Sequence, residues 1–233
     1  MVVQSASRIR ADFDRLAALG QDGWDHNVHY HPFLLRHLPP RCRAALDVGC
    51  GSGAFAEQLA RRADTVLAID LSPGMVRLAR ERLARYPGAE VRLADFSEAD
   101  LPREHFDCVA SIATLHHLPL RSTLARIAGL LRPGGVLLVL DLYRPSTLTD
   151  RMCGAVAFPA SVGLGVVRRG RLRPPREVRE AWNEHARTDV YPTLAEVREA
   201  SREVLPGARV RRHLFWRYSL IWRKPAGPAP SGT

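Results

Sequence analysis

Asp47, Asp70 and Asp95 each stand at the end of a short apolar run, and glycines surround the first of them. Alternate positions of the segment after Asp47 are glycine: Gly49, Gly51 and Gly53. Glycine allows a sharp turn and lets the backbone approach a ligand without a Cβ in the way. A helical pattern begins directly after the glycines, so the N–H groups at the start of that helix are expected to face a bound molecule. These residues predict a small-molecule cofactor site.

The spacing suits two kinds of cofactor, and charge separates them. The loop satisfies the dinucleotide pattern G-x-G-x-x-G/A through Ala54, and Asp70 stands where that pattern puts the acid that accepts ribose hydroxyls. An NAD site is therefore one alternative. Against it, Asp47 would lie close to a pyrophosphate and repel it. Asp95 adds an acceptor suited to an exocyclic amine, and no second nucleotide-binding half follows. A cationic or zwitterionic nucleoside is the better match.

The elements that must hold these side chains alternate between about residues 43 and 143. Apolar runs predict five strands: Ala44–Val48, Thr65–Asp70, Val91–Ala94, Phe106–Ala110 and Val136–Asp141. Amphipathic patterns predict three helices between them: Gly53–Arg62, Pro73–Arg85 and Leu120–Leu131. Strands that alternate with helices of this length form right-handed βαβ units around a parallel sheet. Ligands of such sheets bind at the carboxyl ends of the strands, where the three acids are expected.

The flanking regions have other patterns. Residues 1–40 predict a helical cap over the end of the sheet, with apolar residues at helical spacing from Ile9 and a second helix over Val28–Leu38. Residues 41–224 form the main domain, in which 145–190 is a long connection whose apolar segment Met152–Val167 suits a lid. A capping box starts the helix Thr193–Leu205. Two strands follow, Ala208–Leu214 and Arg217–Arg223, and the tail 225–233 is expected to be disordered.

The amino-acid composition limits which binding partners can be expected. The chain has 233 residues and a formal net charge of +10, and Lys224 is the only lysine among its 34 basic residues. Such arginine use is typical of GC-rich genomes, and without clustering on one face it does not indicate nucleic-acid binding. The densest basic patch, from Arg168 to Arg176, is expected to be a solvated linker. The four cysteines form no C-x-x-C pair, so a cysteine zinc site is not expected.

The chain shows neither a leader pattern nor an apolar run of about 20 residues. We therefore expect a cytoplasmic protein that does not insert into a membrane. The oligomeric state is left open.

Five segments in order resemble the motifs of class I S-adenosylmethionine (SAM)-dependent methyltransferases. They are Leu46–Gly53, Val66–Met75, Ala94–Phe96, Phe106–Leu118 and Leu131–Gly135. The resemblance implies SAM as the cofactor. It also implies an α/β, Rossmann-like, doubly wound fold: a mostly parallel seven-stranded sheet with an antiparallel last strand, here with the N-terminal helical cap.

The resemblance implies roles for the site residues. The glycines at 49, 51 and 53 would shape the loop under the methionine part, and Asp47 would help to hold its ammonium group. Asp70 would hold the ribose hydroxyls. The remaining cofactor contacts it implies are Leu71 and Met75 against the adenine, Asp95 with the Phe96 backbone at the adenine amine, and Ser111 and Ile112 along the methionine side.

Two histidine clusters are candidates for proton removal, because histidine titrates near neutral pH. His116 and His117 follow the fourth strand, although such a pair resembles a common family feature with a structural or cofactor-contacting role. The other cluster spans Trp24–His31, within which His29, Tyr30 and His31 are expected to face the cofactor or the acceptor. Three histidines of this cluster cannot share one helical face, so no metal site is expected.

The methyl acceptor is harder to predict. No Asn-Pro-Pro-Tyr motif of amino-methylating enzymes occurs. The apolar lid and the aromatic residues Trp216, Tyr218 and Trp222 suit a hydrophobic acceptor. We therefore expect a methyltransferase that acts on an O or N atom of a small, hydrophobic molecule. The alternatives are an RNA or protein methyltransferase, or a repurposed SAM-binding protein that transfers no methyl group.

Overall fold

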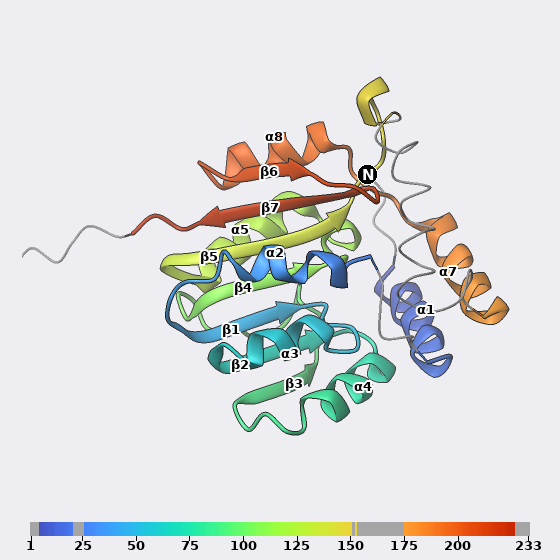
Figure 1. Ribbon diagram of the computed structural model, residues 1–233, viewed down its shortest axis with the longest axis horizontal. Helices are drawn as coiled ribbons and strands as arrows, with labels where there is room; N and C mark the ends of the chain where they lie inside the picture. Colours follow the sequence, from blue (N-terminus) through green and yellow to red (C-terminus); the bar gives the residue numbers. More distant parts are fainter. Residues whose placement is uncertain (1–4, 21–25, 151, 153–174, 227–233) are drawn as a thin grey trace, which may run out of the picture.

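The computed structural model describes residues 5–20, 26–150, 152 and 175–226 (Figure 1). Some of the sequence predictions lie outside these residues. They are the apolar lid segment beyond Met152, the basic patch up to Arg173, Trp24 and Asp25 of the first histidine cluster, and the tail from residue 227.

Seven strands form one sheet in the order β3-β2-β1-β4-β5-β7-β6 (Figure 1). The strands are β1 Cys42–Val48, β2 Ala63–Asp70, β3 Ala89–Leu93, β4 Phe106–Ile112, β5 Leu131–Leu142, β6 Arg209–Arg212 and β7 Arg217–Arg223. Strands β1 to β5 pair in parallel, whereas β7 runs antiparallel to both β5 and β6. The predicted Rossmann-like sheet with an antiparallel last strand is confirmed.

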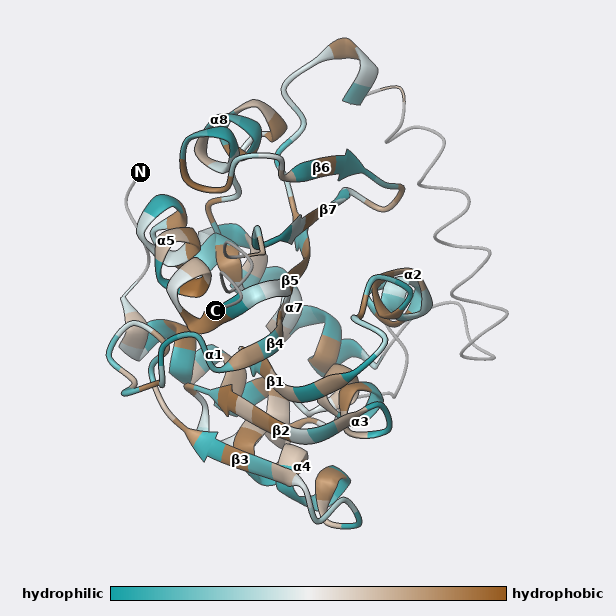
Figure 2. Ribbon diagram, turned by 90° about the vertical axis from the view of Figure 1, so that its left-hand side faces the viewer, coloured by the Kyte–Doolittle hydropathy of each residue, from teal (hydrophilic) through white to brown (hydrophobic). Residues whose placement is uncertain are grey.

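Two hydrophobic cores lie on opposite faces of the sheet, because alternate residues of each strand point to opposite sides. Along β5, Leu137 and Val139 belong to one core, and Leu138 and Leu140 belong to the other. Helices α5 (Leu120–Leu130) and α8 (Leu194–Val204) cover the first core. Helices α2 (His31–Leu35), α3 (Ala54–Ala60) and α4 (Pro73–Leu83) cover the second. The central strands are accordingly apolar, brown in Figure 2.

Local sequence signals explain where the helices begin. The Ser72 hydroxyl accepts a hydrogen bond from the Met75 amide and caps α4. Thr193 and Glu196 form the predicted capping box of α8. Strand β5 starts at Leu131, directly after α5. Residues 132–135, which contain the Pro-Gly-Gly segment, lie at a register shift in the pairing with β4, between Phe106 and Cys108.

Two helices lie beyond the carboxyl ends of the parallel strands (Figure 1). Helix α1 (Ala6–Ala18) contacts α4 and also α7 (Arg176–Thr188). Helix α7 falls within the predicted connection 145–190, for which no helix was predicted from the sequence. Its few apolar side chains include Val178, Ala181 and Trp182, which follow helical spacing, a signal that this prediction did not use. The predicted helix Val28–Leu38 is shorter, a 3₁₀ turn followed by α2, and α2 packs on α3 and β5 rather than over the sheet end. No helix among the described residues is long and apolar enough to cross a membrane.

Candidate functional site

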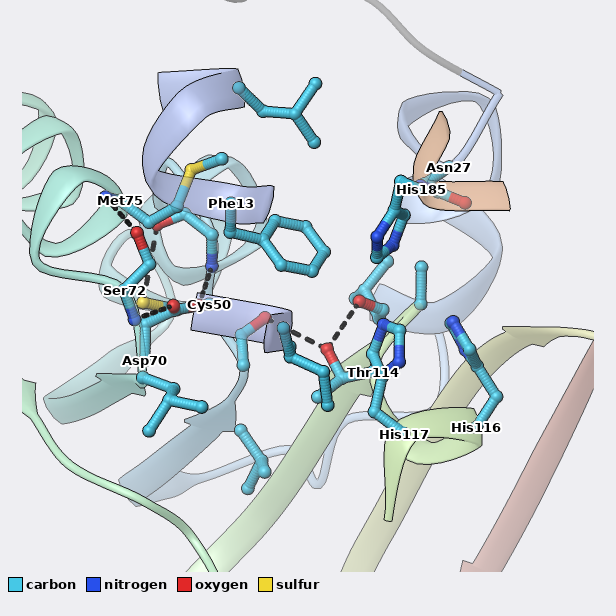
Figure 3. A pocket seen from close by; sticks show the side chains of 18 of the residues that line it. Phe13, Asn27, Cys50, Asp70, Ser72, Met75, Thr114, His116, His117 and His185 are labelled. Carbon is cyan, nitrogen blue, oxygen red and sulfur yellow. Dashed lines mark hydrogen bonds between the residues drawn. The ribbon is translucent and has the colours of Figure 1, made fainter. Parts of the chain in front are cut away.

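A cavity of about 920 Å³ opens at the carboxyl ends of β1, β2, β4 and β5 and is covered by α1 and α7. Figure 3 shows Asp70, Ser72 and Met75 on one side of it and the rings of His116, His117 and His185 on the other, with Phe13 of α1 between the two groups. This is the edge at which open α/β sheets bind ligands. A volume at the upper end of the usual range for small-molecule sites leaves room for more than one ligand.

The glycine loop after β1 is joined to the end of β2. The amides of Gly49 and Cys50 donate to the Ile69 carbonyl, and the amide of Gly51 donates to Oδ2 of Asp70 at 2.8 Å. The Ser72 amide donates to the other Asp70 oxygen at 2.9 Å. These three loop amides are therefore not available to a ligand, because β2 supplies their acceptors. A loop arranged in this way does not favour a pyrophosphate.

The three loop positions require glycine for different structural reasons. All three have positive φ, which favours glycine: +67° at Gly49, +52° at Gly51 and +81° at Gly53. A Cβ at Gly49 would overlap the Thr114 side chain, and a Cβ at Gly53 would meet the Ala79 backbone at 3.1 Å. A Cβ at Gly51 would meet nothing within 4 Å. Gly53 therefore allows α3 and α4 to pack closely and does not line the cavity, whereas Gly49 and Gly51 do.

Asp47 is a buried carboxyl group at the cavity floor that lacks a hydrogen-bond partner. Its residue is 1% exposed, and neither oxygen accepts a hydrogen bond of good geometry. Burial and the charge of Asp70 raise its pKa to about 7, an effect that the nearby Ala56 amide partly offsets. An unpartnered buried carboxylate is costly unless a cation satisfies it. The ammonium group of SAM is a cation of the required kind, so the donor set fits this cofactor.

The predicted nucleoside contacts lie along the same wall. Leu71, Met75, Asp95 and Phe96 all line the cavity together with Asp70. Burial raises the pKa of Asp70, and the amides of Ser72, Gly51 and Leu71 oppose that rise. The Asp95 carboxylate accepts a 2.7 Å hydrogen bond from the Ser97 amide and so also shapes the turn after β3.

His116 lies between two buried carboxylates. Its amide donates to Asp141 Oδ2 at 2.9 Å, its Nδ1 is 2.6 Å from Asp141 Oδ1, and its Nε2 is 3.7 Å from Asp189 Oδ2. Burial alone lowers its pKa, but the charges and hydrogen bonds of Asp141 and Asp189 raise it to about 9. Without a further cation, the ring therefore carries a proton between the two acids.

His117 has the opposite electrostatic environment. Its Nδ1 is 3.8 Å from Asp189 Oδ1, and its Nε2 is buried without a hydrogen-bond partner. Burial and the positive charge of His116 lower its pKa to about 3. Its ring meets the edge of the Phe13 ring at a centroid distance of 5.9 Å. A neutral imidazole therefore faces the cavity next to an aromatic side chain.

His185 joins the helices that cover the cavity to this group. Its Nδ1 is 3.1 Å from Oδ2 of Asp12 on α1, and its Nε2 is 3.2 Å from Oδ2 of Asp189. The Tyr191 hydroxyl donates to Asp189 at 2.8 Å. Asp189 is thus the centre on which α7, α1 and the histidine pair converge.

Most of the predicted site residues are brought together. His31, Ile112, His116 and His117 line the cavity with the cofactor residues above, and His31 packs against Phe55. The side chains of three other predicted residues lie outside the cavity. His29 is exposed beside Phe215, the Tyr30 hydroxyl donates to the Leu214 carbonyl, and the fully buried Ser111 hydroxyl donates to the Val48 carbonyl.

Sequence reasoning missed several residues of the site. Thr114, whose hydroxyl donates to the Gly49 carbonyl, gave no signal beyond its place after the fourth strand. Asp141 had a usable signal, because it ends an apolar strand as Asp47 and Asp70 do. His185 had a usable signal, because it follows Val178, Ala181 and Trp182 at helical spacing, whereas Asp189 had none.

Comparison with known proteins agrees with this geometry. A family model described as a methyltransferase domain matches residues 46–139. An uncharacterized methyltransferase of Mycobacterium tuberculosis (strain ATCC 25618 / H37Rv) is 37% identical over 206 residues, which cover 87% of this chain and 98% of that protein. The ubiquinone biosynthesis O-methyltransferase of Xanthomonas axonopodis pv. citri (strain 306) is 32% identical over 167 residues, 65% of this chain and 70% of that protein. The solved DhpI–SAH complex has the same fold, with a TM-score of 0.64, 20% identity and 96% of each chain covered.

Proposed function

Because the chain belongs to the class I SAM-dependent methyltransferases, we propose that it transfers the methyl group of SAM to an O or N atom of a small, hydrophobic molecule. One observation carries the proposal: a single cavity holds the carboxylates of Asp47 and Asp70 at one end and an aromatic, histidine-lined wall at the other. That wall includes Phe13, His117 and Trp182.

The cofactor half follows from charge. Asp47 would pair with the ammonium group of SAM, and Asp70 would accept hydrogen bonds from both ribose hydroxyls, held in place by Gly51 and Ser72. Leu71 and Met75 would pack on the adenine. The Asp95 carboxylate would accept a hydrogen bond from the adenine amine. Carboxylates suit a positively charged sulfur nucleoside better than they suit a phosphate.

The acceptor half follows from the walls of the rest of the cavity. Phe13 and Trp182 form a T-shaped, edge-to-face pair at a centroid distance of 6.4 Å, and both come from the helices that cover the cavity. Large aromatic side chains stabilise apolar ligands through buried area. The likeness to ubiquinone biosynthesis O-methyltransferases supports an oxygen acceptor. Polymeric acceptors are less well suited, because α1 and α7 roof the cavity.

SAM supplies a methyl group that its positive sulfur already activates. The protein must therefore bind and align the two reactants and exclude water from between them. The carboxylates at the sheet edge would fix the cofactor, and α1 and α7 would cover both molecules. His116 and His117 would stand beside the acceptor, where a hydroxyl acceptor must lose its proton.

Radiolabelled methyl transfer tests the proposal. Purified protein is incubated with methyl-labelled SAM and a cell extract, and the label is measured in the organic-extractable, RNA and protein fractions. We expect label in the organic-extractable fraction. Label confined to RNA or to protein would overturn the small-molecule assignment. SAM binding without label in any fraction would favour a repurposed protein.

The Asp70→Ala variant provides the matched negative sample, since it removes the ribose acceptor. Asp100→Ala serves as the control, because Asp100 is an exposed acid that does not line the cavity. Label that persists at the native level in Asp70→Ala, or that disappears in Asp100→Ala, would contradict the site.

A further inference from the structure

Two histidines and one aspartate meet at the acceptor end of the cavity. His116, His117 and Asp189 each offer one ligand atom, and these atoms lie within 4.8 Å of one another. Asp189 Oδ2 is 3.7 Å from His116 Nε2, and Asp189 Oδ1 is 3.8 Å from His117 Nδ1. Ligands of a tetrahedral zinc ion lie about 3.3 Å apart. Each histidine is therefore within about 0.5 Å of that spacing from one oxygen of the carboxylate.

Neighbouring residues already hold two of these three side chains in position. Asp141 holds His116 through Nδ1 and leaves Nε2 directed at Asp189. A carboxylate on the far nitrogen of a metal-binding histidine is the usual device that fixes the ring and its tautomer. Asp189 is held in the same way by the Tyr191 hydroxyl. The ligands would thus be positioned before an ion arrives.

Polar atoms without partners lie inside the group. Asp189 Oδ1 and His117 Nε2 are both buried and accept no hydrogen bond, and the side chains of Asp189 and His117 are 1% and 7% exposed. Leaving a donor or acceptor buried and unpaired costs about 1–3 kcal/mol. Arg217, which also lines the cavity, donates to Asn27 and to the Phe215 carbonyl instead. A bound cation would satisfy the Asp189 carboxylate.

We propose that His116, His117 and Asp189 bind a divalent transition-metal ion, with Zn²⁺ as the first candidate, and that the open coordination position faces the cavity. Two imidazoles and one carboxylate with a fourth position open are a ligand set found in catalytic zinc sites. No metal site was expected from the sequence, and this group contains none of the histidines of the segment Trp24–His31 whose spacing was considered there.

The chemical role of the ion depends on the proposed methyl transfer. A cation beside the aromatic wall would lower the pKa of an acceptor hydroxyl. The hydroxyl proton would pass to bulk solvent as the O–CH₃ bond forms and the S–CH₃ bond of SAM breaks. His116 and His117, as metal ligands, would hold the ion beside the acceptor and would not accept that proton themselves. The ion would also favour an oxygen acceptor over an apolar carbon.

Metal binding is tested on the full-length protein without a histidine tag, after EDTA treatment and desalting. The protein is titrated with Co²⁺, followed by visible absorption, and with Zn²⁺ in competition with a coloured chelator. We expect one equivalent of metal and a cobalt band typical of low coordination number. His117→Gln and Asp189→Asn should lose the band, and Asp141→Asn should weaken metal binding about 10- to 100-fold.

His29→Gln is the matched control, because it removes an exposed imidazole outside the cavity and should leave the titration unchanged. Circular dichroism checks that each variant is folded. Absence of the cobalt band in the wild-type protein would overturn the site even if a variant fails to fold. A folded His117→Gln or Asp189→Asn that binds metal as the wild type does would also overturn it.

Binding of S-adenosylhomocysteine (SAH), measured on the same metal-free samples, keeps the two proposals apart. Protein that binds SAH but no metal retains the proposed function and loses this inference. Protein that binds one metal ion but no SAH retains the metal site and loses the proposed function.

Discussion

The backbone amide of Gly51 donates a 2.8 Å hydrogen bond to the Asp70 carboxylate, which joins the loop after β1 to the end of β2. The Ser72 amide holds the other oxygen of the same carboxylate. The carboxylate is therefore oriented before any ligand binds. Such preorganisation lowers the entropic cost of binding, because the side chain is already ordered.

Asp70→Ala should weaken SAH binding by roughly 10- to 100-fold, because hydrogen bonds to a charged group contribute about 1.5–3 kcal/mol. Isothermal titration calorimetry measures the loss. Asp70→Asn retains one acceptor oxygen and should lose less than the alanine variant. A folded Asp70→Ala with native affinity would refute the ribose role, and Asp100→Ala is the control.

The loop glycines give a second prediction, in which two alanine substitutions fail for different reasons. Gly49→Ala should destabilise the folded protein, because its Cβ would overlap the Thr114 side chain. Gly51→Ala should cost only the strain of a positive φ, about 1 kcal/mol, yet lose SAH affinity because its methyl group enters the space beside the cavity.

Thermal unfolding and SAH titration on the same two variants separate these effects. We expect the larger drop in melting temperature for Gly49→Ala. For Gly51→Ala we expect the larger loss of SAH affinity relative to its drop in melting temperature. Equal changes in melting temperature and in SAH affinity for both variants would show that Gly49 and Gly51 do not have these separate roles.

The sheet could be predicted from the sequence because each strand has a local signature. A continuous apolar run such as Val136–Leu140 indicates burial on both faces, and Ser72 with Pro73 marks a helix start. The carboxylates at the strand ends follow from the same pattern, since the parallel strands bring their ends to one edge. The sequence alone therefore predicts that Asp47 and Asp70 lie at this edge.

The acceptor side could not be predicted, because it depends on contacts between distant segments. Asp189 reaches His116 from a stretch with no strand or glycine signal, and His185 reaches Asp12 across 173 positions of sequence. The histidines at 29 and 31 are two residues apart, yet only His31 lines the cavity, since the 3₁₀ turn directs His29 outward. Such choices are made by tertiary packing rather than by spacing.

A third prediction concerns the attachment of α1 to α4. The Asp14 carboxylate accepts a 2.6 Å hydrogen bond from the Ser72 hydroxyl and a 2.9 Å one from the Gly74 amide. Asp14→Ala should lower stability by about 0.5–2 kcal/mol, as the loss of a helix cap does. It should also speed SAH dissociation, because α1 covers the cavity.

Hydrogen exchange at the α1 amides and the SAH dissociation rate measure these two effects. Arg8→Ala is the matched control, since Arg8 is an exposed residue of the same helix. If Asp14→Ala leaves both exchange and dissociation at wild-type rates, α1 is not held by this contact.

The last prediction is a pH dependence carried by Asp47, whose pKa is raised to about 7 by burial and by the Asp70 charge. The native state retains this proton up to about pH 7, whereas the unfolded chain loses it near pH 4. The contribution of Asp47 to stability is therefore present at low pH and is lost as the pH rises through that window. Ligand binding changes in the opposite direction, because only the ionised carboxylate pairs with an ammonium group. SAH affinity should rise up to tenfold per pH unit below pH 7.

Calorimetric titration with SAH at pH 5.5 to 7.5 measures this rise, and 5′-methylthioadenosine, which lacks the amino acid part, provides the ligand control. Asp47→Asn keeps the size of the side chain and removes the titrating group, so its SAH affinity should be low and nearly independent of pH. The same slope for both ligands, or an unchanged slope in Asp47→Asn, would assign the pH dependence to another group and separate Asp47 from the ammonium.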